Sequence, residues 1–217
     1  MALFGSRHAA GRLLARRVAE MNYPDPVVFA IARGGVPVAA PVAARLDAPL
    51  ELLLVRKIGV PWQPELAAAA VIDGAMPEIT FDEAVMRQCG LDREFVNRQA
   101  RIELAEIERR RRIYLAKRPP VSVKGRTAIV VDDGVATGTT MRAALRAVRK
   151  RKPARLVLAV PVAARDSLDA LRDEVDDVIC LEQPELFYAV GVNYEAFNQV
   201  TDAEVTQLMK AAEQQES

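Results

Sequence analysis

The sequence predicts an α/β protein with a mostly parallel sheet, helices on both faces and a small hood or flap. Short apolar runs alternate with segments of helical spacing, the pattern of strands joined by crossover helices. A run such as residues 128–131 is apolar at every position, which is typical of a strand buried on both faces. The 217 residues, 51% of them hydrophobic, suffice for one good-sized domain, so we expect a single domain over residues 1–217.

Bulk charge and cysteine content narrow the functional classes. Lys plus Arg number 30 and Asp plus Glu number 29, so net charge indicates neither a nucleic-acid nor a membrane partner. Cys89 and Cys180 lie far apart, which does not match a metal-ligand spacing or a disulfide framework and favours a reducing, cytoplasmic setting. No apolar stretch is long enough to span a bilayer, and we expect no secretory signal.

The first part of the chain is expected to alternate helix and strand. Leucine and valine recur among arginines at mixed spacing near the N-terminus, two apolar runs have the length of buried strands, and Pro37 fits the first turn of a helix. The expected elements are a helix over 7–21, a strand over 27–31, a helix over 36–46 and a strand over 50–55.

The middle of the chain departs from this alternation. Residues 58–65 contain one glycine and two prolines and predict a long exposed loop. Residues 66–72 are apolar and favour a strand, although the run of alanines leaves a helix open, and residues 77–81 suit a short extra strand.

A helical insertion is expected near residues 83–118, with a long helix over 91–115. Its four consecutive arginines, 109–112, could form a nucleic-acid patch. Acid-before-base pairs at i,i+4, such as Glu106 with Arg110, favour a solvated helix face instead.

The second half returns to strand and helix. A helix is expected from Met141, where apolar residues fall at i, i+3, i+4 and i+7. Further expected elements are strands over 128–131, 156–160 and 175–181, a helix over 164–172 and a last helix from about Asp202. We expect residues 182–217 to form a hood or tail, which holds the four rings Phe187, Tyr188, Tyr194 and Phe197.

The stretch AIVVDDGVATGTT, residues 128–140, carries the chemistry. Asp132 and Asp133 follow a strand directly, and small residues then lead into a helix, at the sheet edge where open α/β sheets bind ligands. Backbone N–H groups of the turn suit a phosphate, while the two acids suit vicinal hydroxyls or a hydrated Mg²⁺. No Lys follows the last Gly, and G-x-G spacing is absent, so neither a Walker A loop nor a dinucleotide fingerprint fits. The pattern predicts a ribose phosphate site.

This stretch resembles the signature of type I phosphoribosyltransferases over its full length. The resemblance implies a site for phosphoribosyl pyrophosphate, in which Asp132 and Asp133 face the ribose hydroxyls and hold Mg²⁺ through water. It also implies that Ala136, Thr137, Gly138, Thr139 and Thr140 hold the 5′-phosphate, and that Gly134 and Val135 of the same turn bind substrate.

Two further stretches match the family. Arg33-Gly34-Gly35 resembles the pyrophosphate loop, and the peptide that enters this loop in the family is often cis, which here is Ala32–Arg33. VRKIGVP, residues 55–61, is similar to adenine phosphoribosyltransferases, which implies that Arg56 and Lys57 neutralise pyrophosphate. The matches cover roughly residues 27–160. The whole chain looks most like bacterial phosphoribosyltransferases whose acceptor is undefined.

The reaction implied is displacement of pyrophosphate from the anomeric carbon by a nitrogen nucleophile, such as a nucleobase. Mg²⁺, Arg33, Arg56 and Lys57 would stabilise the leaving group, and the loop over 58–65 would form a lid that excludes water. Hypoxanthine-guanine enzymes carry an Asp where this chain has Ala136, which argues against that specificity.

The acceptor side is the less determined part of the site. Glu65 is a candidate acid–base residue, the alternative being a solvated loop Glu. Phe187 and Tyr188 are candidates for stacking on a planar acceptor, the alternative being rings that dock the tail.

Rival functions remain open at this point. The chain could be a regulatory sensor that keeps the site only to bind nucleotide or phosphoribosyl pyrophosphate, although Arg33, Arg56 and Lys57 favour an enzyme. A phosphorylated receiver domain is disfavoured by the glycine- and threonine-rich turn. A homodimer is one assembly we consider, although the sequence determines neither the oligomeric state nor the acceptor.

Overall fold

The computed structural model describes residues 2–72, 78–115 and 120–215, with the backbone alone for Pro64, Glu65, Glu78 and Gln215. A parallel sheet of five strands lies at its centre, in the order β3-β2-β7-β8-β9. These strands are β2 (Pro26–Ile31), β3 (Leu50–Leu53), β7 (Thr127–Val131), β8 (Arg155–Val162) and β9 (Asp177–Glu182). The strand order reverses between β2 and β7, which is the switch point where doubly wound sheets bind ligands.

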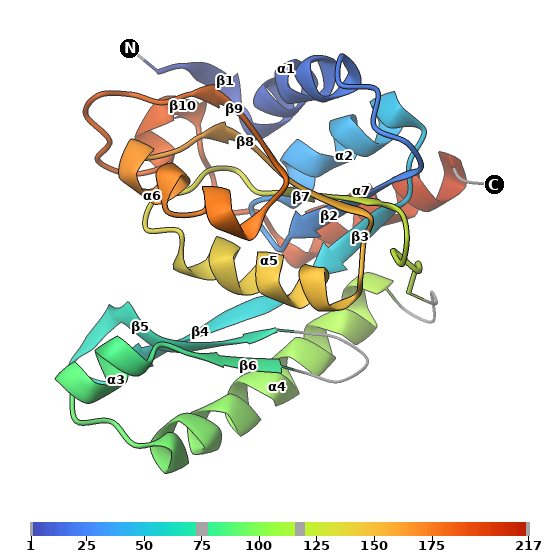
Figure 1. Cartoon of the computed structure of the whole chain (residues 1–217). Helices are drawn as coiled ribbons and strands as arrows, with labels where there is room; N and C mark the ends of the chain where they lie inside the picture. Colours follow the sequence, from blue (N-terminus) through green and yellow to red (C-terminus); the bar gives the residue numbers. More distant parts are fainter. Residues whose placement is uncertain (1, 73–77, 116–119, 216–217) are drawn as a thin grey trace.

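Helices cover both faces of this sheet, as predicted. Helices α1 (Arg7–Ala19) and α2 (Val36–Leu46) lie on one face, and α5 (Thr139–Lys150) lies on the other (Figure 1). Alternate residues of β2 enter opposite cores: Val28 and Ala30 pack with α1 and α2, whereas Val27 and Phe29 pack with α5. Both faces of the strand are therefore buried, which explains why its sequence is apolar at every position.

A second, antiparallel sheet lies beside α5, in the order β4-β5-β6 (Figure 1). Its strands are β4 (Val55–Val60), β5 (Gln63–Ile72) and β6 (Glu78–Phe81). The strand expected over residues 66–72 is confirmed as part of β5, and the strand expected over 77–81 is confirmed from residue 78 onwards. Residues 73–77 lie outside the described residues.

The long exposed loop predicted over residues 58–65 is wrong. Residues 58–60 complete β4, β5 begins at Gln63, and the connection between them is a tight turn at Pro61 and Trp62. Ile58 and Val60 are buried while Gly59 between them is not, so this segment has the alternation of a half-buried strand. The pairing of β4 with β5 shifts register on both sides of Gly59, as it does at a β-bulge.

The insertion near residues 83–118 contains two helices, α3 (Glu83–Gln88) and α4 (Arg93–Leu115), and residues 116–118 lie outside the described residues. The side chain of Asp82 caps α3 by accepting from the Val85 N–H at 3.0 Å. Asp92 accepts from the Phe95 N–H at 2.7 Å, which fixes the start of the long helix at Arg93 rather than at residue 91.

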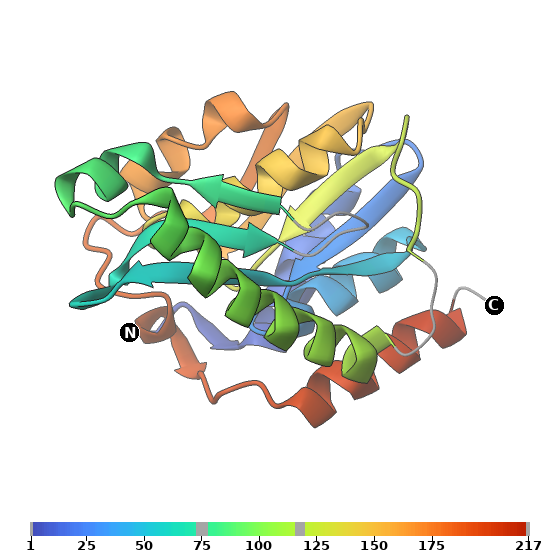
Figure 2. The same cartoon turned by 90° about the horizontal axis from the view of Figure 1, so that it is seen from below.

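The remaining elements close the fold around the C-terminus. The segment predicted as a helix over 164–172 is one turn of α6 (Arg165–Asp169) followed by a 3₁₀ turn over Arg172–Glu174. The short parallel pair β1 (Phe4–Ser6) and β10 (Tyr194–Ala196) was not predicted. Helix α7 (Asp202–Gln215) begins where expected and packs against α2 and α4 (Figure 2). Within the described ranges, no helix has both the length and the apolar character needed to cross a membrane.

Candidate functional site

A cavity of about 390 Å³ lies at the carboxyl ends of β2 and β7, at the switch point of the parallel sheet. The strand ends supply Arg33, Gly34, Asp132 and Asp133, and the start of α5 supplies Thr140. The rest of the lining comes from α1, from the end of β2 and from the segment before α7, namely Arg7, Ile31, Ala32, Phe197, Gln199 and Val200. Two of the three motifs that the sequence singled out, residues 33–35 and 128–140, thus contribute to this cavity, and the third, residues 55–61, does not line it.

The two adjacent acids lie deep in this cavity. Asp132 Oδ1 accepts from the backbone N–H of Asp133 at 2.9 Å, and Asp133 Oδ2 accepts from Arg7 Nε at 2.7 Å. The Tyr194 hydroxyl donates to the Asp133 carbonyl at 2.5 Å and so fixes this part of the backbone. Burial raises the pKa of Asp132, and the nearby Asp133 charge adds to that effect. Burial also raises the pKa of Asp133, although the Arg7 guanidinium opposes it.

Arg7 is a residue of this site that no motif indicated. Its guanidinium also donates to the Asn198 carbonyl at 2.8 Å and lies 3.6 Å from the centre of the Phe197 ring. A sequence signal was present, because Arg7 is the first residue of α1, and cations are unfavourable at the positive end of a helix dipole. The α1 first turn contains no acid that could offset this charge, so Arg7 needed a partner elsewhere.

The loop after β2 approaches the acids closely. The Ala32–Arg33 peptide is cis, which confirms the sequence prediction. A Cβ atom at Gly34 would collide with the carboxylate of Asp133, so a larger residue here would displace that carboxylate. Arg33 extends from the same loop, and its Nη1 lies 3.4 Å from Asp202 Oδ1 of α7.

The turn over residues 134–140 is anchored to the end of β8. Val135 donates to the Val162 carbonyl at 3.0 Å, and the Ala164 N–H donates to the Val135 carbonyl at 2.9 Å. Gly138 has a φ of 75°, a conformation that favours glycine, and it precedes the first residue of α5. Ala136 and Thr137 are exposed, Thr140 lines the cavity of the two acids, and Thr139 lines a different one.

Arg56 and Lys57 lie away from this cavity, inside β4 rather than at the end of a strand. Arg56 Nε donates to Glu103 Oε2 of α4 at 2.6 Å. Lys57 is exposed and lines a separate cavity of about 220 Å³ that faces α4. Glu65 belongs to β5 rather than to a loop, and its side chain is outside the described part of the structure.

Comparison with known proteins settles the family. Residues 5–195 match the family described as "Phosphoribosyl transferase domain". The chain belongs to the phosphoribosyl transferase family. This confirms the family that the AIVVDDGVATGTT signature indicated, together with the predicted α/β fold.

Relatives of this phosphoribosyl transferase family member cover nearly all of its length. Over 212 residues it is 41% identical to the Mycobacterium tuberculosis proteins "Putative phosphoribosyl transferase MT0597" and "Putative phosphoribosyl transferase Rv0571c". The match covers 98% of this chain but 47% of each relative, so the chain spans about half their length.

Two solved structures share the fold. TT1426 from Thermus thermophilus has a TM-score of 0.79 and 39% identity, covering 96% of this chain and 98% of that one. The AQ2163 protein from Aquifex aeolicus has a TM-score of 0.51 and 13% identity, covering 81% of this chain and 73% of that one, which shows the fold alone.

The aromatic residues proposed for the acceptor lie elsewhere than the cavity of the two acids. Phe187 is half-buried and packs with Phe4 and Tyr194, so it helps to dock the tail. Tyr188 is 80% exposed. Among the described residues, the ring that lines this phosphoribosyl transferase cavity is Phe197.

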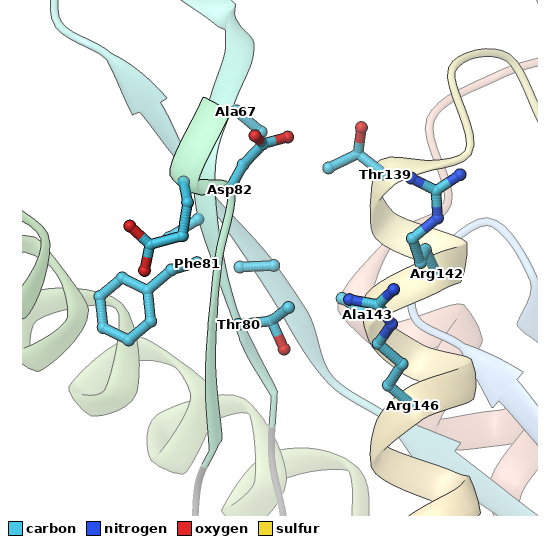
Figure 3. A pocket seen from close by; sticks show the side chains of 11 residues that line it. Ala67, Thr80, Phe81, Asp82, Thr139, Arg142, Ala143 and Arg146 are labelled. Carbon is cyan, nitrogen blue, oxygen red and sulfur yellow. The ribbon is translucent and has the colours of Figure 1, made fainter. Parts of the chain in front are cut away.

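A second cavity of about 300 Å³ separates α5 from the antiparallel sheet (Figure 3). Thr80 and Asp82 lie on one wall, and Thr139, Arg142 and Arg146 lie on the other (Figure 3). Its charged groups are already paired within the protein: Arg146 Nη2 bonds to Glu174 at 2.6 Å, and Asp82 caps α3.

The described residues hold no group of three or more His, Cys, Asp or Glu side chains that could hold a metal ion. Asp132 and Asp133 form an acid pair, which suits a hydrated Mg²⁺ whose other ligands come from a bound phosphate compound. The carboxylate oxygens of Asp132 and Asp133 thus fit the Mg²⁺ ion that the family resemblance implies. These two acids would hold the ion through water.

Proposed function

We propose that this protein transfers a phosphoribosyl group from phosphoribosyl pyrophosphate to a nitrogen acceptor and releases pyrophosphate. The observation that supports this most is the convergence of Asp132, Asp133, Arg33 and Thr140 on one cavity at the switch point. This substrate requires carboxylates that bind its diol, a turn of small residues that binds its phosphate, and a cation that stabilises its leaving group.

Each residue has a role that follows from its position. Asp132 and the remaining oxygen of Asp133 accept hydrogen bonds from the ribose hydroxyls, while Arg7 holds the other Asp133 oxygen. Backbone N–H groups of residues 136–140 and the Thr140 hydroxyl bind the 5′-phosphate. Arg33 stabilises the charge that develops on the departing pyrophosphate. Mg²⁺, when bound with the donor, supplies further neutralisation of that charge.

The acceptor in this proposal is a nucleobase or related heterocycle. Ala136 supplies no carboxylate beside the turn, so the proton of the acceptor is managed by a group other than this residue. Arg56 and Lys57 serve pyrophosphate only if β4 approaches the cavity when the donor binds. A cytoplasmic setting agrees with the free thiols of Cys89 and Cys180, and a homodimer is the assembly to test by light scattering.

The proposal is tested first by donor binding. We expect Asp132→Asn combined with Asp133→Asn to weaken calorimetric binding of phosphoribosyl pyrophosphate with Mg²⁺ at least tenfold, because charge-assisted hydrogen bonds contribute about 1.5–3 kcal/mol each. Asp169→Asn is the matched control, since Asp169 is an exposed α6 residue paired with Arg172. Unchanged affinity in the double variant would remove the acids from the donor site.

A second measurement separates an enzyme from a sensor. The wild-type protein is incubated with donor, Mg²⁺ and a panel of nucleobases and small heterocyclic amines, and pyrophosphate release is followed. Release with one acceptor class supports phosphoribosyl transfer. Tight donor binding without release across the panel would favour the regulatory sensor instead.

A further inference from the structure

Asp202 connects the cavity to the helices that lie outside the family motifs. It is the first residue of α7, and its Oδ1 accepts from the Tyr114 hydroxyl at 2.5 Å and from Arg33 Nη1 at 3.4 Å. Its Oδ2 lies 3.9 Å from Arg109 Nη2. Tyr114 and Arg109 both belong to α4, so one carboxylate joins α4, α7 and the loop after β2.

Helix packing and a hydrogen bond hold Asp202 in place. Helix α7 packs against α2 and α4, and the two views show α4 and α7 side by side near their ends (Figure 2). The Tyr114 hydrogen bond, together with the charges of nearby arginines including Arg33, lowers the pKa of Asp202 and keeps it ionised. Burial, followed by the hydrogen bond to Asp202, raises the pKa of Tyr114 to about 12, so the phenol remains a donor.

Arg33 is held at one edge and open at the other. In the described part of the chain, the Arg33 side chain makes its hydrogen bond through Nη1, which donates to Asp202 Oδ1. Among the residues that the structure describes, none accepts from Nε or Nη2 of the planar guanidinium, and Arg33 lines the cavity of Asp132 and Asp133. An arginine fixed in this way can present a two-donor edge to a phosphate oxygen pair.

We propose that Asp202 is a positioning residue, which fixes the Arg33 guanidinium so that its open edge meets the pyrophosphate group of the donor. The inference rests on the proposed function. Tyr114 supports it indirectly by holding Asp202. Helix α4 lies outside the three short sequence motifs, and through Tyr114 and Asp202 it contributes to donor binding without contacting the donor.

The test compares two ligands, phosphoribosyl pyrophosphate and ribose 5-phosphate, which lacks the pyrophosphate. We expect Asp202→Asn to weaken calorimetric binding of phosphoribosyl pyrophosphate about fivefold and to leave ribose 5-phosphate binding unchanged. Tyr114→Phe should have the same selectivity with a smaller effect. In the presence of an acceptor found by the panel, Asp202→Asn should raise the KM for the donor more than it lowers kcat.

Controls separate positioning from a general effect on folding. Glu204→Gln changes an exposed acid in the first turn of the same helix and should alter neither affinity. In an Arg33→Gln background, Asp202→Asn should have no further effect on phosphoribosyl pyrophosphate binding. Equal weakening of both ligands, or full additivity with Arg33→Gln, would overturn the inference while leaving the proposed function intact. A wild-type protein that binds neither ligand would overturn both.

Discussion

Two arginines line the cavity, and the carboxylates that hold them lie in different surroundings. Arg7 and Asp133 are 2.7 Å apart, and their side chains are 12% and 14% exposed. Arg33 and Asp202 are 3.4 Å apart, and their side chains are 24% and 36% exposed. Arg7 has two further partners, the Asn198 carbonyl and the Phe197 ring, whereas within the described ranges Arg33 Nε and Nη2 bond to no acceptor.

This difference separates a structural cation from one that can serve a ligand. Breaking a buried ion pair by removing one partner costs about 3–5 kcal/mol, because an uncompensated charge is left behind. A pair nearer to solvent contributes less, and a fully exposed one only about 0–1 kcal/mol. We infer that Arg7 is a fixed part of the wall that neutralises the two acids, and that Arg33 is the arginine which a phosphate can engage.

The largest effect should follow from removing the buried cation. We expect Arg7→Met to lower the free energy of unfolding by about 3 kcal/mol, because Asp133 would stay buried without its partner. Urea unfolding at neutral pH measures this. Arg17→Met is the control on the same helix: Arg17 pairs with Glu20 at the surface, where both side chains are more than half exposed, and its loss should cost under about 0.5 kcal/mol. Similar costs for the two variants would contradict the distinction.

An intermediate effect is expected at Gly34, the residue that lies between the two pairs. Gly34→Ala would place a Cβ atom on the carboxylate of Asp133, which must then move away from Arg7. Overpacking of this kind costs about 1–3 kcal/mol, and we expect donor binding to fall with stability. Gly5→Ala is the control, because a Cβ there would lie 3.7 Å from Glu195 Oε2, an ordinary contact. Gly34→Ala with wild-type stability and affinity would show that Asp133 can relax freely.

The sequence predicted the parallel sheet well because its central strands β2, β7 and β8 are buried on both faces. Residues 128–131 and 27–31 are apolar throughout, and both fall within observed strands. The hairpin of β4 and β5 was missed at residues 58–65 because glycine and proline usually indicate loops. Its pairing depends instead on partners such as Ala69, opposite Ile58, and Ala67, opposite Gly59, which become neighbours only in the folded chain.

The site was predictable where neighbours in sequence are neighbours in space. Asp132, Asp133 and Thr140 come from one short segment that carries its own chemical pattern. Arg7 contacts Asp133 across 126 residues of sequence, and Asp202 contacts Arg33 across 169, so no local pattern could reveal either pair. Arg56 was assigned to the site from a local match, and in the structure it bonds to Glu103 of α4 instead.

The smallest effect should come from the charge of the half-buried Asp202 carboxylate. The pH dependence of this effect has a defined sign. The Tyr114 hydrogen bond and nearby arginines lower the pKa of Asp202, so its contribution to stability is present above the unfolded-state pKa of about 3.9 and is lost as pH falls through the native value. The side chain is 36% exposed, so solvent screening limits that contribution to at most about 1 kcal/mol, or roughly 2–4 °C in Tm.

Asp202→Asn tests the contribution of this charge directly. The substitution removes the charge, while the asparagine oxygen can still accept from the Tyr114 hydroxyl. We expect the Tm of this variant to lie slightly below that of the wild type at pH 7, with a smaller gap at a pH below the unfolded-state pKa of about 3.9. Glu204→Gln, which removes an acid from the same first turn, measures how much of the gap comes from the helix dipole alone. A gap of the same size at both pH values would mean that the shape of the Asp202 side chain, rather than its charge on Arg33, stabilises the start of α7.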